Sequence, residues 1–69
     1  MALSPREAQV VLGIVDGLKY HEIAASLGLT YETVKTYVRR IRKKLDLDSK
    51  TAIAVWGVRN GRLLKQCQD

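Results

Sequence analysis

The sequence predicts an all-α fold, a four-helix bundle that contains a helix-turn-helix. Apolar residues recur at helical spacing, glycines that can end helices follow them, and no stretch alternates apolar and polar residues over the length of a strand. A chain of 69 residues has room for one domain. We therefore expect a single domain over residues 1–69, with helices at about 5–16, 20–27, 31–45 and 49–60 and a tail at 62–69.

The first helix has a clear start signal. Ser4 can cap the helix, Pro5 suits its first position, and Glu7 can reach back to the backbone of the cap. The apolar residues that follow have helical spacing; they are Val10, Val11, Ile14 and Val15. Gly17 is a signal for the end of this helix.

The second and third predicted helices form the helix-turn-helix. The short second helix ends at Gly28, which permits the left-handed backbone of a sharp turn, and Thr30 can cap the longer third helix. A short helix, the turn Gly28-Leu29-Thr30 and a longer helix have the spacing of a helix-turn-helix, although a generic helical hairpin has a similar pattern.

The third predicted helix has two chemically different faces. At about 100° per residue, its apolar positions lie within about 60° of one another; they are Val34, Val38, Ile41 and Leu45. Basic side chains cover the opposite side, and they include Lys35, Arg39, Arg40, Arg42 and Lys43. The major groove of DNA accepts a helix of this kind, whereas the alternative is a solvated face that binds nothing.

Position along this helix separates the expected roles. Residues near the start of a recognition helix reach base edges, so we expect Lys35, Thr36 and Arg39 to contact bases. Other hydroxyl and basic side chains are expected on the DNA backbone; they are Thr30, Tyr31, Thr33, Tyr37, Arg40, Arg42 and Lys43.

The fourth predicted helix is apolar on two sides. One side suits the core and holds Ile53, Ala54, Gly57 and Val58; the other holds Ala52, Val55, Trp56 and Arg59. A helix of this kind is deeply buried or has an outside partner, and we expect a homodimer on DNA through the second side. The alternative is that Trp56 folds back over the first helix. Gly61 is expected to end the helix, leaving a frayed or loose tail from Leu63.

Four segments of the sequence resemble the LuxR-type (GerE or NarL/FixJ) helix-turn-helix DNA-binding domain. They are LSPREAQVV at 3–11, GLKYHEIAASLGLTYETVKTY at 17–37, IRKKLDLDSKTAI at 41–53 and VRNGRL at 58–63. The resemblance implies a bacterial transcription factor whose third helix occupies the major groove and whose fourth helix commonly mediates dimerisation. By position, it assigns base contacts to Lys35, Thr36 and Arg39.

The sequence departs from the family pattern at four positions. Lys19 stands where a serine cap is frequent, and it could meet a DNA phosphate together with Tyr20. Tyr37 replaces a frequent histidine, Asp46 stands where glycine is common, and Asp48 stands where a basic residue is frequent.

Composition and charge limit which other classes of function are compatible with the sequence. A net charge of +5 and a pI of about 9.7 suit nucleic acid, an anionic membrane or an acidic protein. The apolar stretch at 10–15 is too short to span a membrane, and the basic face lacks the apolar anchors of an interfacial helix. His21 and Cys67 are single residues of their types, so we expect no enzyme, metal or cofactor. One cysteine also favours a reducing, cytoplasmic setting.

Two alternative functions stay open. Region 4 of a sigma factor has a similar opening and a similar third helix, and it binds a promoter element while attached to RNA polymerase, which is a candidate partner here as well. However, that region normally ends with the recognition helix. A helix-turn-helix that binds an acidic protein and never meets DNA is the second alternative.

Overall fold

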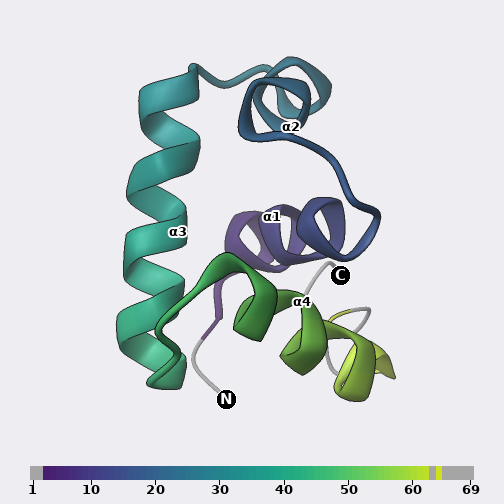
Figure 1. The fold of residues 1–69 in the computed structure, drawn as a ribbon. Helices are drawn as coiled ribbons and strands as arrows, with labels where there is room; N and C mark the ends of the chain where they lie inside the picture. Colours follow the sequence, from purple (N-terminus) through teal and green to yellow (C-terminus); the bar gives the residue numbers. More distant parts are fainter. Residues whose placement is uncertain (1–2, 63, 65–69) are drawn as a thin grey trace.

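The computed structural model describes residues 3–62 and 64, which form four helices and, within those residues, no strand. The helices are α1 (Pro5–Val15), α2 (Tyr20–Leu27), α3 (Tyr31–Leu45) and α4 (Lys50–Arg59). This confirms the all-α prediction, and every helix boundary lies within one residue of its expected position. In Figure 1, α3 runs along one side of the molecule, and α1 lies between α2 and α4.

Side-chain caps start three of the four helices. Ser4 Oγ accepts the Glu7 N–H at 3.2 Å while the Glu7 carboxylate accepts the Ser4 N–H at 2.8 Å, which is the predicted capping box. The Thr30 and Ser49 hydroxyls cap α3 and α4 by accepting the N–H groups of Thr33 and Ala52. Lysine cannot accept a hydrogen bond, so α2 has half a box, in which Glu22 accepts the Lys19 N–H at 2.8 Å.

Three helices end in the same left-handed turn. Gly17 and Gly28 have φ of 80° and 69°, and the amide after each glycine donates to the carbonyl five residues back, from Leu18 to Gly13 at 3.1 Å and from Leu29 to Ala24 at 2.8 Å. Asp46 adopts φ 55° at the end of α3, where the Leu47 N–H donates to the Arg42 carbonyl at 2.9 Å. α3 therefore ends at its expected position, although no glycine is present there.

The core surrounds α1, which packs against all three other helices. The largest fully buried side chains of the core come from all four helices and from one residue after α4; they are Val10, Val11, Ile23, Val34, Ile41, Ile53 and Leu64. Gly57 brings α4 close to α1, because a Cβ at this position would lie 2.5 Å from Val15 Cγ2 and 2.9 Å from Val11 Cγ1.

An ion pair joins the start of α1 to the end of α3. Glu7 is only 2% exposed, and its Oε1 accepts from Lys44 Nζ at 2.7 Å. Burial by itself raises the pKa of Glu7, but hydrogen bonds from Lys44 and Ser4 and the charge of Lys44 outweigh it and lower the pKa. Glu7 therefore acts both as a cap and as a tertiary contact.

The structure corrects the sequence prediction at the end of the chain. Val58, predicted in the core, is 70% exposed, and Trp56 is half-buried against the core. α4 ends at Arg59, before Gly61 as expected, but Gly61 has no positive φ and the chain is helical again at Gly61 and Arg62; Leu64, predicted in a loose tail, is helical and completely buried. The rest of that predicted tail, 63 and 65–69, lies outside the described residues.

Candidate nucleic-acid interface

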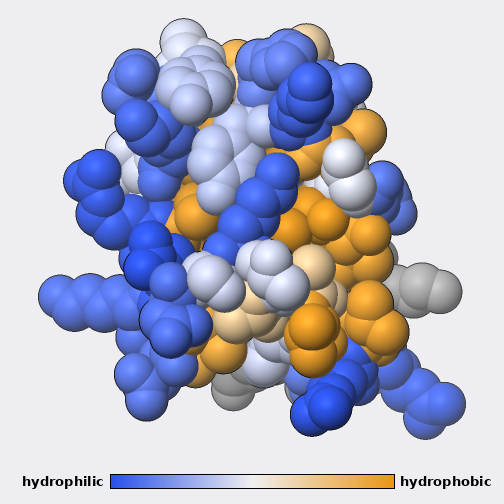
Figure 2. Space-filling model, in the orientation of Figure 1, coloured by the Kyte–Doolittle hydropathy of each residue, from blue (hydrophilic) through white to orange (hydrophobic). Residues whose placement is uncertain are grey.

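The two-faced character of α3 is present in the structure. Val34, Val38 and Ile41 are buried against the other helices. The opposite side is exposed, and it carries Lys35, Thr36, Arg39, Arg40, Arg42 and Lys43. Figure 2 shows hydrophilic residues projecting along the side that α3 occupies in Figure 1, while apolar residues gather on the opposite side. The molecule therefore presents a cationic surface along one helix.

The three residues predicted to contact bases lie on consecutive turns of this surface. Lys35 Nζ lies 5.5 Å from the centre of the Tyr31 ring, so the lysine is held near the start of α3. Thr36 Oγ1 donates to the Glu32 carbonyl at 3.1 Å, so its hydroxyl proton is engaged. Its methyl group is the part suited to a contact with thymine.

Aromatic rings connect α3 to α2 and α4. The rings of Tyr20 and Tyr31, the first residues of α2 and α3, have centres 6.4 Å apart. Lys35 lies over the Tyr31 ring, and Lys50 Nζ, from the first residue of α4, lies 4.8 Å from the centre of the Tyr20 ring. Cations and rings therefore form a row of four residues that crosses from α4 to α3.

Burial against this surface affects the hydroxyl of Tyr20. Desolvation raises the pKa of Tyr20 above its ordinary value of 10.0, the charge of Arg42 opposes the rise, and Tyr31 adds to it. The hydroxyl thus stays protonated near neutral pH and can donate a hydrogen bond to an anion.

Shallow grooves lie on both sides of the exposed ridge of α3. One groove is lined by Tyr20, Lys35, Val38, Arg39 and Arg42. The other is lined by Thr33, Thr36, Tyr37 and Arg40, with Arg40 Cζ 6.0 Å from the centre of the Tyr37 ring. Each groove combines positive charge with an aromatic wall.

Several residues predicted on the DNA backbone have structural contacts as well. The Thr30 and Thr33 hydroxyls lie 2.8 Å apart and belong to the cap of α3. Arg42 donates to the Asp48 carbonyl at 2.8 Å, which fastens the loop between α3 and α4. Lys19 and Lys43 are exposed at the surface. Arg42 therefore has a structural role and cannot be regarded as a pure DNA contact.

An exposed apolar patch lies on α4, away from these grooves. Val55 is 47% exposed and Val58 is 70% exposed, and with Ala54 and Arg59 they line a shallow groove that is almost entirely apolar. Of the four residues expected on the second face of α4, only Val55 and Arg59 line this groove; Ala54 and Val58, expected on the core side, take the places of Ala52 and Trp56. We call the four residues that line the groove the α4 patch.

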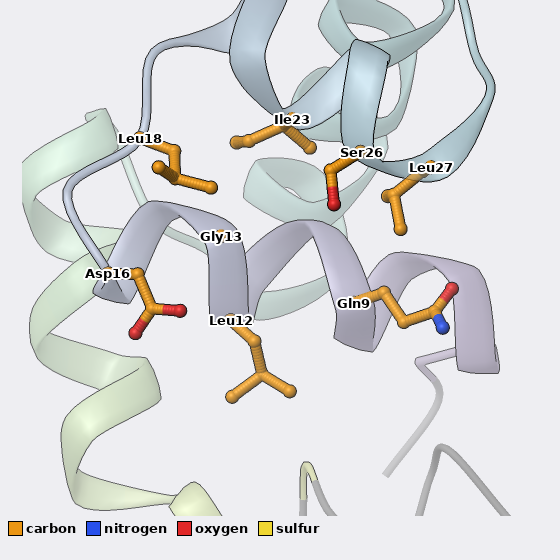
Figure 3. Close-up of a pocket in the computed structure, with 8 residues that line it drawn as sticks. All are labelled: Gln9, Leu12, Gly13, Asp16, Leu18, Ile23, Ser26 and Leu27. Atoms are coloured by element: carbon orange, nitrogen blue, oxygen red, sulfur yellow. The ribbon is translucent and has the colours of Figure 1, made fainter.

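A pocket lies between α1 and α2, apart from the cationic surface of α3 (Figure 3). Leu18, Ile23 and Leu27 face α1 there, and Gly13 allows the approach, because a Cβ at this position would lie 2.8 Å from Ile23 Cγ1. Asp16 is the one charged residue in its lining.

Within residues 3–62 and 64, no group of histidine, cysteine and acidic residues could hold a metal ion. No helix in this part of the chain is long and apolar enough to cross a membrane.

Comparison with known proteins assigns the family. Residues 1–57 match the family of bacterial regulatory proteins named luxR. The chain belongs to the LuxR family. This assignment confirms the resemblance seen in the sequence, and it favours the LuxR-type domain over region 4 of a sigma factor. The chain is a helix-turn-helix domain of a family of DNA-binding transcription regulators.

Curated relatives agree with this assignment. The chain is 37% identical to the transcriptional regulatory protein LiaR of Bacillus subtilis over 86% of its length, and 41% identical to the nitrate/nitrite response regulator protein NarL of Escherichia coli over 78%. It is 42% identical to the response regulator GacA of Pseudomonas viridiflava over 86%. The chain spans 28%, 25% and 28% of these relatives, about a quarter of each. No solved structure matches the chain at a significant level.

Proposed function

We propose that the chain binds double-stranded DNA sequence-specifically, as the output domain of a bacterial transcriptional regulator, with α3 in the major groove. The observation that carries the proposal is the division of α3 into a buried apolar side and an exposed cationic side. A helix anchored by one face can present the other to base edges without changing the fold. The length and position of α3 after a short α2 support the same arrangement.

Base contacts and backbone contacts fall to different residues in this proposal. Lys35, Thr36 and Arg39 contact base edges. Side chains on either side of α3 and at the start of α2 contact the phosphates that border the groove; they are Lys19, Tyr20, Thr30, Tyr31, Thr33, Tyr37, Arg40, Arg42 and Lys43. The two grooves beside α3 support this division, because each places a cation next to an aromatic ring.

Two copies pair through α4 in the proposed complex. The sequence assigned this role to Ala52, Val55, Trp56 and Arg59; the exposure of Val58 now favours the α4 patch as the contact. A two-fold dimer matches two half-sites about one turn of DNA, ~34 Å, apart. RNA polymerase remains a proposed partner of the DNA-bound form.

Selection of bound sequences from random duplex DNA tests the proposal, followed by affinity measurements on the selected site and on single-base variants. Lys35→Ala is expected to relax the preference at one base position, at which discrimination falls by about 1–3 kcal/mol. Lys43→Ala is the matched control, which should weaken binding to all sequences alike. Lys43 is the better control than Arg42 because Arg42 also holds the α3–α4 loop.

Two results would contradict the proposal. Equal losses on every sequence for Lys35→Ala would remove the base contact from that residue. Salt dependence provides the second test. If about six phosphates are neutralised, the logarithm of the DNA association constant should fall with the logarithm of the salt concentration at a slope near −5. Weak affinity with no enriched sequence would instead favour the protein-binding alternative.

A further inference from the structure

Lys50 lies at the edge of the cationic surface, although the sequence pattern of α3 does not include it. It is the first residue of α4, and its Nζ donates to the Leu18 carbonyl at 3.3 Å. The same ammonium lies 4.8 Å from the centre of the Tyr20 ring. Two contacts therefore hold the charge of a surface lysine next to the first residue of α2.

Tyr20 connects this charge to the rest of the interface. Its ring lines the groove that also contains Lys35, Arg39 and Arg42. Lys50 therefore brings a cation from α4 to the ring of Tyr20, which lines a groove whose cations all come from α3. An ammonium group has three N–H donors, so the bond to the Leu18 carbonyl leaves donors for a second acceptor.

We propose that Lys50 contacts a backbone phosphate of DNA beside Tyr20, which extends the DNA interface from α2 and α3 onto α4. This inference rests on the proposed function, because it places DNA on the cationic face of α3. A phosphodiester is the expected ligand, since it is an anion with acceptor oxygens and it borders the groove that α3 occupies. The contact carries no sequence information, so Lys50 adds affinity without adding specificity.

The salt dependence of DNA affinity tests this contact, with Lys50→Gln as the main variant. We expect about a threefold to tenfold loss of affinity on every sequence, and a salt slope smaller in magnitude by about 1, because one fewer phosphate is neutralised. Arg62→Gln is the matched control, since it removes the same charge from an exposed residue beyond α4. It should leave the slope unchanged.

Lys50→Arg tests whether the positive charge at this position accounts for the salt slope. It keeps a cation, so it should keep the slope of the wild type. A set of duplexes with a single neutral methylphosphonate at each position then locates the contact. One position should weaken wild-type binding but leave Lys50→Gln unaffected, because the variant no longer makes that contact.

The outcomes separate this inference from the proposed function. Steep salt dependence in the wild type with an unchanged slope in Lys50→Gln would overturn the Lys50 contact alone. An equal change of slope in Lys50→Gln and Arg62→Gln would do the same, because it would reflect net charge. Absence of salt-dependent DNA binding in the wild type would overturn both.

Discussion

The third and fourth helices differ in how well their composition determines which side of the helix is buried. On α3, a buried apolar stripe opposes arginines and lysines, and the predicted and observed faces agree. On α4, apolar residues occupy both sides, and the prediction exchanged Val58 and Trp56. Chemical contrast between two faces orients a helix, because charged groups cannot be buried cheaply without partners. Where both faces are apolar, the packing of neighbouring helices decides.

The largest expected effect tests the chain after α4. Leu64→Ala should lower the free energy of unfolding by roughly 3 kcal/mol, because it leaves a cavity at a completely buried position. Urea unfolding at equilibrium measures the change. Val58→Ala is the control and should cost well under 1 kcal/mol, since Val58 is 70% exposed. Equal effects of the two substitutions would contradict the burial of Leu64 in the core.

Glu7→Gln tests how α3 is held against α1. Loss of the charged hydrogen bond with Lys44 should lower the free energy of unfolding by about 2 kcal/mol at pH 7. The pKa of Glu7 is lower in the folded protein than its ordinary value of 4.5, so protonation favours the unfolded chain. The stability from Glu7 is therefore complete above its unfolded pKa and is lost as the pH falls below 4.5 toward the folded pKa.

Unfolding at a series of pH values measures this contribution. The difference between wild type and Glu7→Gln should shrink as the pH is lowered from 6 toward 3. A constant difference over that range would show that the carboxylate charge is not what holds α3 to α1.

Val58→Glu tests the outward side of α4. The substitution should reduce cooperative binding to paired half-sites by about tenfold, ~1.4 kcal/mol, because it places like charges at a two-fold interface. Affinity for a single half-site and thermal stability should hardly change, since Val58 is exposed. Thr51→Glu, at another exposed position of α4, is the control. Unchanged cooperativity in Val58→Glu would remove the α4 patch from the proposed dimer.

Asp46→Gly gives the smallest expected effect, at the turn where α3 leads toward α4. Asp46 has a left-handed backbone with φ 55°, which glycine adopts without steric cost. We expect an increase in the free energy of unfolding of about 0.5 kcal/mol, since the greater freedom of glycine in the unfolded chain offsets part of the gain. Asp48→Gly has no positive φ to relieve and should be slightly destabilising. A loss of stability in Asp46→Gly would show that the aspartate side chain contributes to the turn.

Local signals explain why much of the fold was predictable. The caps Ser4, Thr30 and Ser49 and the stops Gly17 and Gly28 act over only a few residues, and all of them appear in the structure. Gly61 shows the limit of such signals. α4 ends just before this glycine, but Gly61 has no left-handed backbone, and the chain is helical again up to the buried Leu64.

The candidate site was predictable only in part for the same reason. Residues on α3 share one helix, so their spacing places them on one face, and Lys35, Thr36 and Arg39 lie exposed as expected. Whether they contact bases stays a prediction. Lys50 could not be found by spacing, because thirty positions of sequence separate it from Tyr20 and the contact forms only when α4 packs on α1 and α3 and brings Lys50 to the start of α2.

By itself, the sequence determined the number of helices, their boundaries and the cationic side of α3, since these depend on interactions between residues close in the chain. Only the tertiary structure decided which side of α4 is covered, that Leu64 enters the core, and which cation lies beside Tyr20. These features depend on shape and close approach, for example at Gly57, where α4 can touch α1 because the side chain is missing. Packing of that kind is a property of two surfaces together, so neither segment specifies it alone.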